Sequence, residues 1–196
     1  MSRTFKPRIL LLAAIISVFS ACNSYDPPTN TSKAPPNNAP PDTAFPMPPV
    51  NGASINNLGW TFGGGKRNVF SDFKGKVLIL DFYATWCEPC RRSVPHLIGL
   101  QKKYESEGLH VVGLNVGGEE DEEKVPDFAN EFGIQYTLAK PDDELVTLLM
   151  AGNDAIPQTF VFDRQGQLAE RLIGFGPNAG QRIDSAVEAA LQTPAP

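Results

Sequence analysis

The stretch Val77-Leu78-Ile79-Leu80-Asp81-Phe82-Tyr83-Ala84-Thr85-Trp86-Cys87-Glu88-Pro89-Cys90 decides how this chain of 196 residues folds. Its first seven residues are apolar or aromatic except for Asp81, which predicts a strand buried in the centre of a sheet. Residues 91–104 then carry apolar side chains at helical spacing. Cys87 and Cys90 therefore lie where a buried strand ends and a helix begins.

This position predicts redox chemistry. A thiolate at a helix N-terminus meets unpaired N–H groups and the positive end of the helix dipole, so the pKa of Cys87 should fall below that of free cysteine. Cys90, three residues later, lies one helical turn away and can attack a mixed disulfide formed by Cys87. Glu88 and Pro89 separate the two sulfurs, and the negative charge of Glu88 opposes formation of the thiolate.

Three other interpretations of the cysteine pair remain open. It can be half of a zinc site, but structural zinc needs four ligands and the chain offers only His96 and His110 as further soft ligands. It can also be a structural disulfide, or two buried and inert thiols. No metal and no cofactor is expected.

The other patterns along the chain predict an α/β domain. The expected elements are a hairpin over 60–70, a strand over 109–116, helices over 124–132 and 142–151, strands over 159–162 and 168–173, and a helix over 178–192. This order gives a mixed central sheet with helices on both faces. The acidic run 119–123 is expected to be a solvated loop, or else an acidic docking patch.

The segment 81–90 resembles the active-site segment of the thioredoxin superfamily. Lys74-Gly75-Lys76-Val77 before it and Arg91-Arg92-Ser93-Val94-Pro95 after it point to the TlpA/ResA-like branch of tethered disulfide reductases. The resemblance extends over about residues 58–176. It implies a thioredoxin-like fold with an N-terminal hairpin extension, and a thiol–disulfide oxidoreductase in which Glu88 and Pro89 favour a reductant over a strong oxidant.

Four further positions follow from this resemblance. Asp81, whose pKa burial should raise, would accept the proton of the second thiol; a solvent-facing acid is the alternative. Ile156-Pro157 resembles the cis-proline loop that pairs with a substrate peptide, although an ordinary trans proline is possible. Trp86, unless it is packed in the core, would flank the thiols on the docking surface, together with Glu88 and Pro89. Pro95 should kink its helix.

The first fifty residues predict an export signal and a tether. Residues 1–21 have a basic start, a short apolar stretch and small residues before Cys22, which is typical of a signal peptide. Phe19-Ser20-Ala21-Cys22 resembles a bacterial lipobox apart from Phe19, which implies lipidation of Cys22; ordinary cleavage near Ala21 is the alternative. The proline-rich residues 22–50 would be an extended tether, and residues 51–193 the thioredoxin-like domain.

Together these features indicate a lipid-anchored enzyme of the cell envelope that faces the periplasm or another extracytoplasmic space. A net charge of -5 argues against a nucleic-acid partner. By resemblance, the partners would be disulfide-containing proteins, such as apocytochromes in cytochrome c maturation, and a membrane thiol transporter or thioredoxin-like electron donor. A thiol peroxidase using Thr85 and Arg91, or a copper-binding envelope module using His110, is the alternative.

Overall fold

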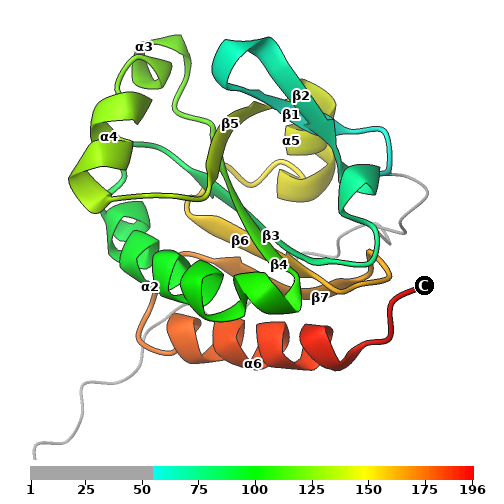
Figure 1. Cartoon of the computed structure of the whole chain (residues 1–196). Helices are drawn as coiled ribbons and strands as arrows, with labels where there is room; N and C mark the ends of the chain where they lie inside the picture. Colours follow the sequence, from blue (N-terminus) through cyan, green and yellow to red (C-terminus); the bar gives the residue numbers. More distant parts are fainter. Residues whose placement is uncertain (1–54) are drawn as a thin grey trace, which may run out of the picture. The chain divides into compact units, whose positions relative to one another are not determined.

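The structure is a computed structural model that describes residues 55–196. Its centre is one seven-stranded mixed sheet in the order β2-β1-β5-β4-β3-β6-β7 (Figure 1). The strands are β1 Gly59–Phe62, β2 Lys66–Val69, β3 Val77–Tyr83, β4 Leu109–Asn115, β5 Thr137–Pro141, β6 Gln158–Phe162 and β7 Leu168–Ile173. The α-helices are α2 Glu88–Tyr104, α3 Glu119–Glu122, α4 Val125–Phe132, α5 Asp143–Met150 and α6 Ala179–Gln192. Strands β3, β4 and β5 are parallel, and β1, β2, β6 and β7 join by antiparallel pairing.

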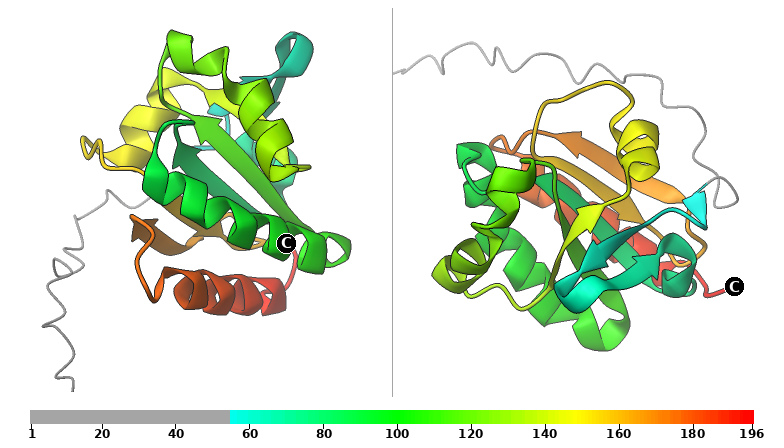
Figure 2. Two further views of the ribbon diagram at one scale, coloured as in Figure 1. Left: turned by 90° about the vertical axis from the view of Figure 1, so that its left-hand side faces the viewer. Right: turned by 90° about the horizontal axis from the view of Figure 1, so that it is seen from above.

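Helices cover both faces of this sheet, as Figures 1 and 2 show. Alternate residues of β3 point to opposite faces. Val77 and Ile79 pack in one apolar cluster with residues of α2 and α6, whereas Leu78 and Leu80 pack in another cluster with residues of α5. All seven residues of β3 are buried, which confirms the central strand predicted from its apolar run.

Two elements differ from the sequence-based expectation. Helix α2 begins at Glu88, three residues before the predicted start, because Cys87 is the N-cap and Pro89 fits in the first turn. Strand β5 was not predicted. Its sequence Thr-Leu-Ala-Lys-Pro has only two buried residues and lacks a clear alternating pattern; pairing with β4 and β1 makes it a strand.

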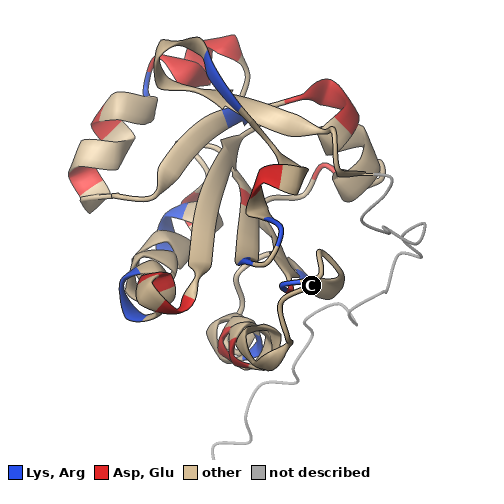
Figure 3. Ribbon diagram, turned by 45° about the vertical axis from the view of Figure 1, so that its right-hand side comes forward, with Lys and Arg blue, Asp and Glu red and all other residues tan. Residues whose placement is uncertain are grey.

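The acidic run is also not the solvated loop that we expected. It forms the short helix α3, in which Asp121 is 1% exposed. Glu119, Glu120 and Glu123 are exposed. Acidic residues mark α3 and α4 in Figure 3. The expectation was therefore wrong for Asp121, because its carboxylate has partners in the folded chain that the local sequence does not reveal.

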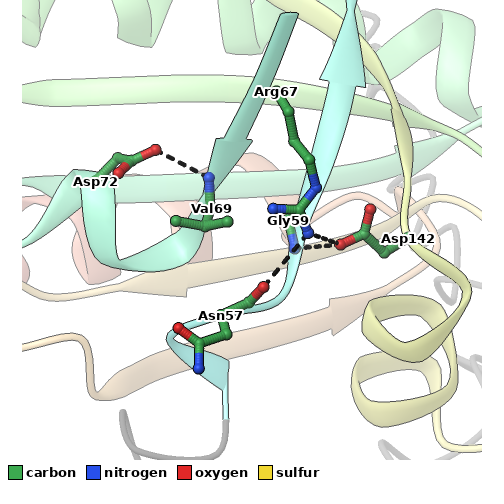
Figure 4. A network of polar contacts seen from close by, with 6 residues as sticks. All are labelled: Asn57, Gly59, Arg67, Val69, Asp72 and Asp142. Atoms are coloured by element: carbon green, nitrogen blue, oxygen red, sulfur yellow. Dashed lines mark hydrogen bonds and ion pairs between the residues drawn. The ribbon is translucent and has the colours of Figure 1, made fainter.

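A polar network attaches the N-terminal hairpin to the rest of the domain (Figure 4). One oxygen of Asp142, directly before α5, accepts a hydrogen bond from the Gly59 N–H (2.8 Å) and pairs with Arg67. Arg67 also donates to the Asn57 carbonyl (3.3 Å). A Cβ on Gly59 would lie 2.0 Å from the Asn68 carbonyl oxygen, so only glycine fits at this position between β1 and β2.

Several predictions concern residues outside the described range. Cys22, the signal segment 1–21, the tether 22–50 and the start of the domain at residue 51 all lie outside residues 55–196. Between residues 55 and 196, no helix combines the length and the apolar character needed to cross a bilayer.

Candidate active site

The two cysteines of the predicted redox pair are joined as a disulfide at the N-terminus of α2. The Cys90 N–H donates to the Cys87 sulfur at 3.2 Å. Cys87 is 4% exposed and Cys90 is fully buried, so Cys87 is the more accessible sulfur. This arrangement confirms that the pair lies at the junction of strand and helix.

The histidines do not join the cysteines in a metal site. His96 Nε2 lies 3.1 Å from a carboxylate oxygen of Asp184, and His110 Nε2 lies 3.1 Å from the Lys76 ammonium. His110 of β4 is paired in register with Leu78, near the start of β3, whereas Cys87 follows the end of β3. No cluster of three or more metal-ligating side chains occurs in residues 55–196. The zinc and copper interpretations therefore lack a ligand set in this part of the chain.

Asp81 lies inside the sheet, on the face that α2 covers. It is 2% exposed, so the solvent-facing alternative is wrong. Burial raises the pKa of Asp81 from 3.8 to about 7, although a hydrogen bond from the Thr159 hydroxyl (2.7 Å) opposes the shift. The carboxyl group can therefore gain or lose a proton near neutral pH, as its predicted role requires.

The neighbouring strand makes room for the rings beside Asp81. Gly113 of β4 is paired in register with Asp81. A Cβ on Gly113 would lie 2.6 Å from the Leu138 side chain, 3.2 Å from the Tyr83 ring and 3.5 Å from the Tyr136 ring. The absence of a side chain at Gly113 thus lets these groups pack closely over the strand.

The Ile156-Pro157 peptide bond is cis, as predicted. The Cys87 sulfur lies 3.7 Å from the Ile156 carbonyl oxygen, so this loop lies directly beside the redox pair. Pro157 is buried and Ile156 is partly exposed. The loop and Cys87 together form the surface on which we expected a substrate peptide.

Gln158, which the sequence patterns did not single out, holds this loop. The amide of Gln158, which is fully buried, donates to the carbonyls of Asn153 (2.6 Å) and Ala155 (2.9 Å). Its oxygen accepts a hydrogen bond from Arg171 at 2.9 Å. A glutamine at the start of a buried strand was the available signal, because a buried amide needs partners.

Trp86 is 65% exposed and is the only large hydrophobic side chain that is exposed in residues 55–196. Core packing is therefore the wrong explanation for Trp86. Glu88 is also exposed, and it forms an ion pair with Arg92 at 3.7 Å. Pro89 is partly exposed in the first turn of α2. Helix α2 continues through Pro95 as one element, and the kink there stays a prediction.

The two residues of the peroxidase alternative are engaged elsewhere. The Thr85 hydroxyl donates to Asp121. Arg91 donates to the Thr85 carbonyl (3.2 Å) and pairs with Glu131. Its guanidinium also lies 4.9 Å from the centre of the Phe132 ring. These contacts do not favour peroxide activation at Cys87.

Known proteins with similar sequences are thiol–disulfide oxidoreductases by name. ResA of Bacillus subtilis (strain 168) is 33% identical over 110 residues, which is 56% of this chain and 60% of ResA. ResA of Bacillus anthracis is 30% identical over 110 residues, or 62% of its length. The chain thus spans about three fifths of these relatives.

Solved structures extend the likeness to the fold. A thiol:disulfide interchange protein of the thioredoxin family from Chlorobium tepidum TLS has a TM-score of 0.58 and 30% identity, covering 68% of this chain and 92% of that one. A secreted Mycobacterium tuberculosis disulfide oxidoreductase, with a TM-score of 0.56 and 16% identity over 69% of this chain and 98% of that one, shows the fold alone. The AhpC/TSA family matches residues 54–171. The cysteine pair, the cis-proline loop and this match agree, and the chain belongs to the AhpC/TSA family, with a thioredoxin-like fold.

Proposed function

We propose that this protein is an extracytoplasmic thiol–disulfide oxidoreductase that reduces protein disulfides through Cys87 and Cys90. The observation that carries the proposal is the joined cysteine pair at the start of α2, 3.7 Å from the cis-proline loop. The names of the similar Bacillus and Chlorobium proteins support the same reaction.

The reaction begins with the reduced pair. The Cys87 thiolate attacks one sulfur of a substrate disulfide, and the other substrate sulfur leaves as a thiolate. Cys90 then loses its proton to Asp81 and attacks the Cys87 sulfur, which releases the second substrate thiolate. The substrate gains two electrons and the protein ends with the Cys87–Cys90 disulfide. Asp81 suits the proton transfer because burial brings its pKa to about 7.

The substrate would bind as an extended peptide across the loop beside the sulfurs. Ile156 offers its backbone to such a strand, and Pro157 orders the loop. Trp86 adds an exposed apolar surface beside Cys87. Glu88 and Pro89, between the cysteines, complete the proposed docking surface.

In the cell, the protein would be held at a membrane. Lipidation at Cys22 would anchor the chain to a membrane, and residues 22–50 would separate the anchor from a domain over 51–193. A membrane thiol transporter or another thioredoxin-like protein would return two electrons to the disulfide. Cytochrome c maturation is one setting in which such a reductant is needed.

Replacing Cys22 with serine should release the protein from the membrane fraction. Unchanged membrane retention would contradict the anchor.

The reaction itself is tested by reduction of insulin disulfides with dithiothreitol as the electron source. The wild type should accelerate the reaction, and Cys87→Ser should abolish the acceleration. Cys90→Ser should instead accumulate a mixed disulfide through Cys87. Equilibration with glutathione then gives the direction: a potential near about -270 mV supports a reductant, and one near about -120 mV would make the protein an oxidant.

A further inference from the structure

A buried carboxylate outside the proposed reaction holds the segment directly before the cysteines. Asp121 of α3 is 1% exposed. One of its oxygens accepts hydrogen bonds from the Thr85 N–H (2.8 Å) and the Asn115 side-chain amide (3.0 Å). Its other oxygen accepts the Thr85 hydroxyl proton. Asp121 thus binds Thr85 through both the backbone and the side chain.

The other side of Thr85 is fixed as well. Its carbonyl accepts a hydrogen bond from Arg91 at 3.2 Å, and Arg91 is itself held by Glu131. The Cys87 N–H then donates to the Ala84 carbonyl at 3.2 Å, which closes the turn that contains Thr85. Asp121 therefore holds the N–H of Thr85, and Arg91 holds its carbonyl group.

The surroundings of Asp121 are shaped to hold it. A Cβ on Gly117 would lie 2.4 Å from the Asp121 carboxylate, so the chain passes too close for any other residue. The Gly117 N–H donates to the side-chain oxygen of Asn115 at 2.7 Å, which orients the amide toward Asp121. Burial alone would raise the pKa of Asp121, but the hydrogen bonds from Thr85 and Asn115 outweigh it and lower the pKa. Asp121 is therefore ionised at neutral pH.

We propose that Asp121 is a positioning residue for thiol–disulfide exchange. It acts through Thr85 to keep Cys87 at the N-terminus of α2 and to keep the Trp86 side chain exposed to solvent. The proposal rests on the function proposed above. The hydrogen bonds of Asp121 go to Thr85 and Asn115 and not to either sulfur. Its effect passes through the turn 84–87, which places the Cys87 sulfur within reach of the Cys90 N–H. The helix N-terminus stabilises the thiolate only while that geometry is kept.

Three variants separate hydrogen bonding from charge. Asp121→Ala removes the charge and all three hydrogen bonds. Asp121→Asn removes the same charge, but its oxygen can accept from Thr85 and Asn115 while its amide donates to the Thr85 hydroxyl. Glu120→Ala, at an exposed acid in the same helix, is the matched control.

The measurement is the pH profile of Cys87 alkylation by iodoacetamide in the reduced protein carrying Cys90→Ser. In the Asp121→Ala variant, the Cys87 pKa should move up toward about 8.5, the value of free cysteine, and alkylation at neutral pH should slow about threefold or more. The shift in Asp121→Asn should be smaller, and Glu120→Ala should follow the unsubstituted profile. Superimposable profiles for Asp121→Ala and the parent would overturn the proposal.

A second pair of variants covers the case in which Asp121→Ala does not fold. Thr85→Val loses the hydroxyl but keeps the N–H, and Thr85→Ser keeps both groups. The valine variant should raise the Cys87 pKa more than the serine variant, and equal profiles would contradict the proposal. Insulin reduction by the wild type is measured in parallel. An inactive wild type with a shifted Asp121→Ala profile would refute the proposed function alone, whereas an active wild type with unshifted profiles would refute the positioning role alone.

Discussion

Replacing Asp81 with asparagine should stabilise the oxidised protein, and the gain should grow with pH. The folded state raises the pKa of Asp81 from 3.8 to about 7, so it holds the proton more tightly than the unfolded chain does. Raising the pH from about 4 to about 7 therefore favours the unfolded state through this group. At about 1.4 kcal/mol for each pKa unit, the full cost of the ionised carboxylate is about 4 kcal/mol.

Asparagine avoids this cost because it is neutral at every pH. Its side-chain oxygen can still accept the Thr159 hydroxyl proton that Asp81 accepts at 2.7 Å. Urea unfolding of both oxidised proteins should give nearly equal free energies of unfolding near pH 4. At pH 8 the Asp81→Asn variant should be more stable by about 4 kcal/mol.

The control is Asp127→Asn, at an exposed carboxylate of α4, which should change stability by less than about 0.5 kcal/mol at either pH. A stability difference for Asp81→Asn that is the same at both pH values would refute the reasoning, and so would one that shrinks as pH rises. The same variant should reduce insulin about tenfold more slowly or worse, since Cys90 would lose its proposed proton acceptor. A more stable but slower variant is the combined signature of a carboxylate that is buried at a cost in stability because proton transfer needs it there.

Three other substitutions test separate parts of the structure. Trp86→Ala should raise the KM for insulin severalfold while changing the free energy of unfolding by less than about 0.5 kcal/mol, because the side chain is 65% exposed; an unchanged KM would remove Trp86 from the docking surface. Asp142→Ala should cost about 1–2 kcal/mol in urea unfolding, since the Gly59 N–H and Arg67 lose their shared acceptor, and wild-type stability would show that the network contributes nothing. Gly113→Ala should cost about 1–3 kcal/mol, because its Cβ would lie 2.6 Å from Leu138; a melting temperature equal to that of the wild type would show that the strand adjusts freely.

The sequence predicted the parts of the site that depend on local pattern. A run of six apolar or aromatic residues interrupted by one acid located both β3 and the burial of Asp81. The apolar side chains at helical spacing over residues 91–104 located the helix after this strand, although α2 begins three residues earlier, at Glu88. The cis bond before Pro157 came from the family resemblance, because periodicity does not distinguish cis from trans proline.

What the sequence did not predict depends on contacts between distant segments. Asp121 lies in a run of five acids, and its neighbours Glu120 and Glu122 carry the same type of side chain. Its burial follows from partners 36 and 6 residues away, Thr85 and Asn115. Strand β5 likewise forms because β4 and β1 pair with it on either side. Local propensity carries little information about such partners.

The two edge strands of the sheet disfavour aggregation of the protein at high concentration. β2 has four residues and begins with Lys66 and Arg67, and β7 carries Glu170 and Arg171. Short or charged border strands resist lengthwise pairing with a second sheet, because such pairing would bring like charges together and strip them of water. The fold can therefore offer backbone to the proposed substrate peptide at Ile156 without favouring polymerisation along the edges of its sheet.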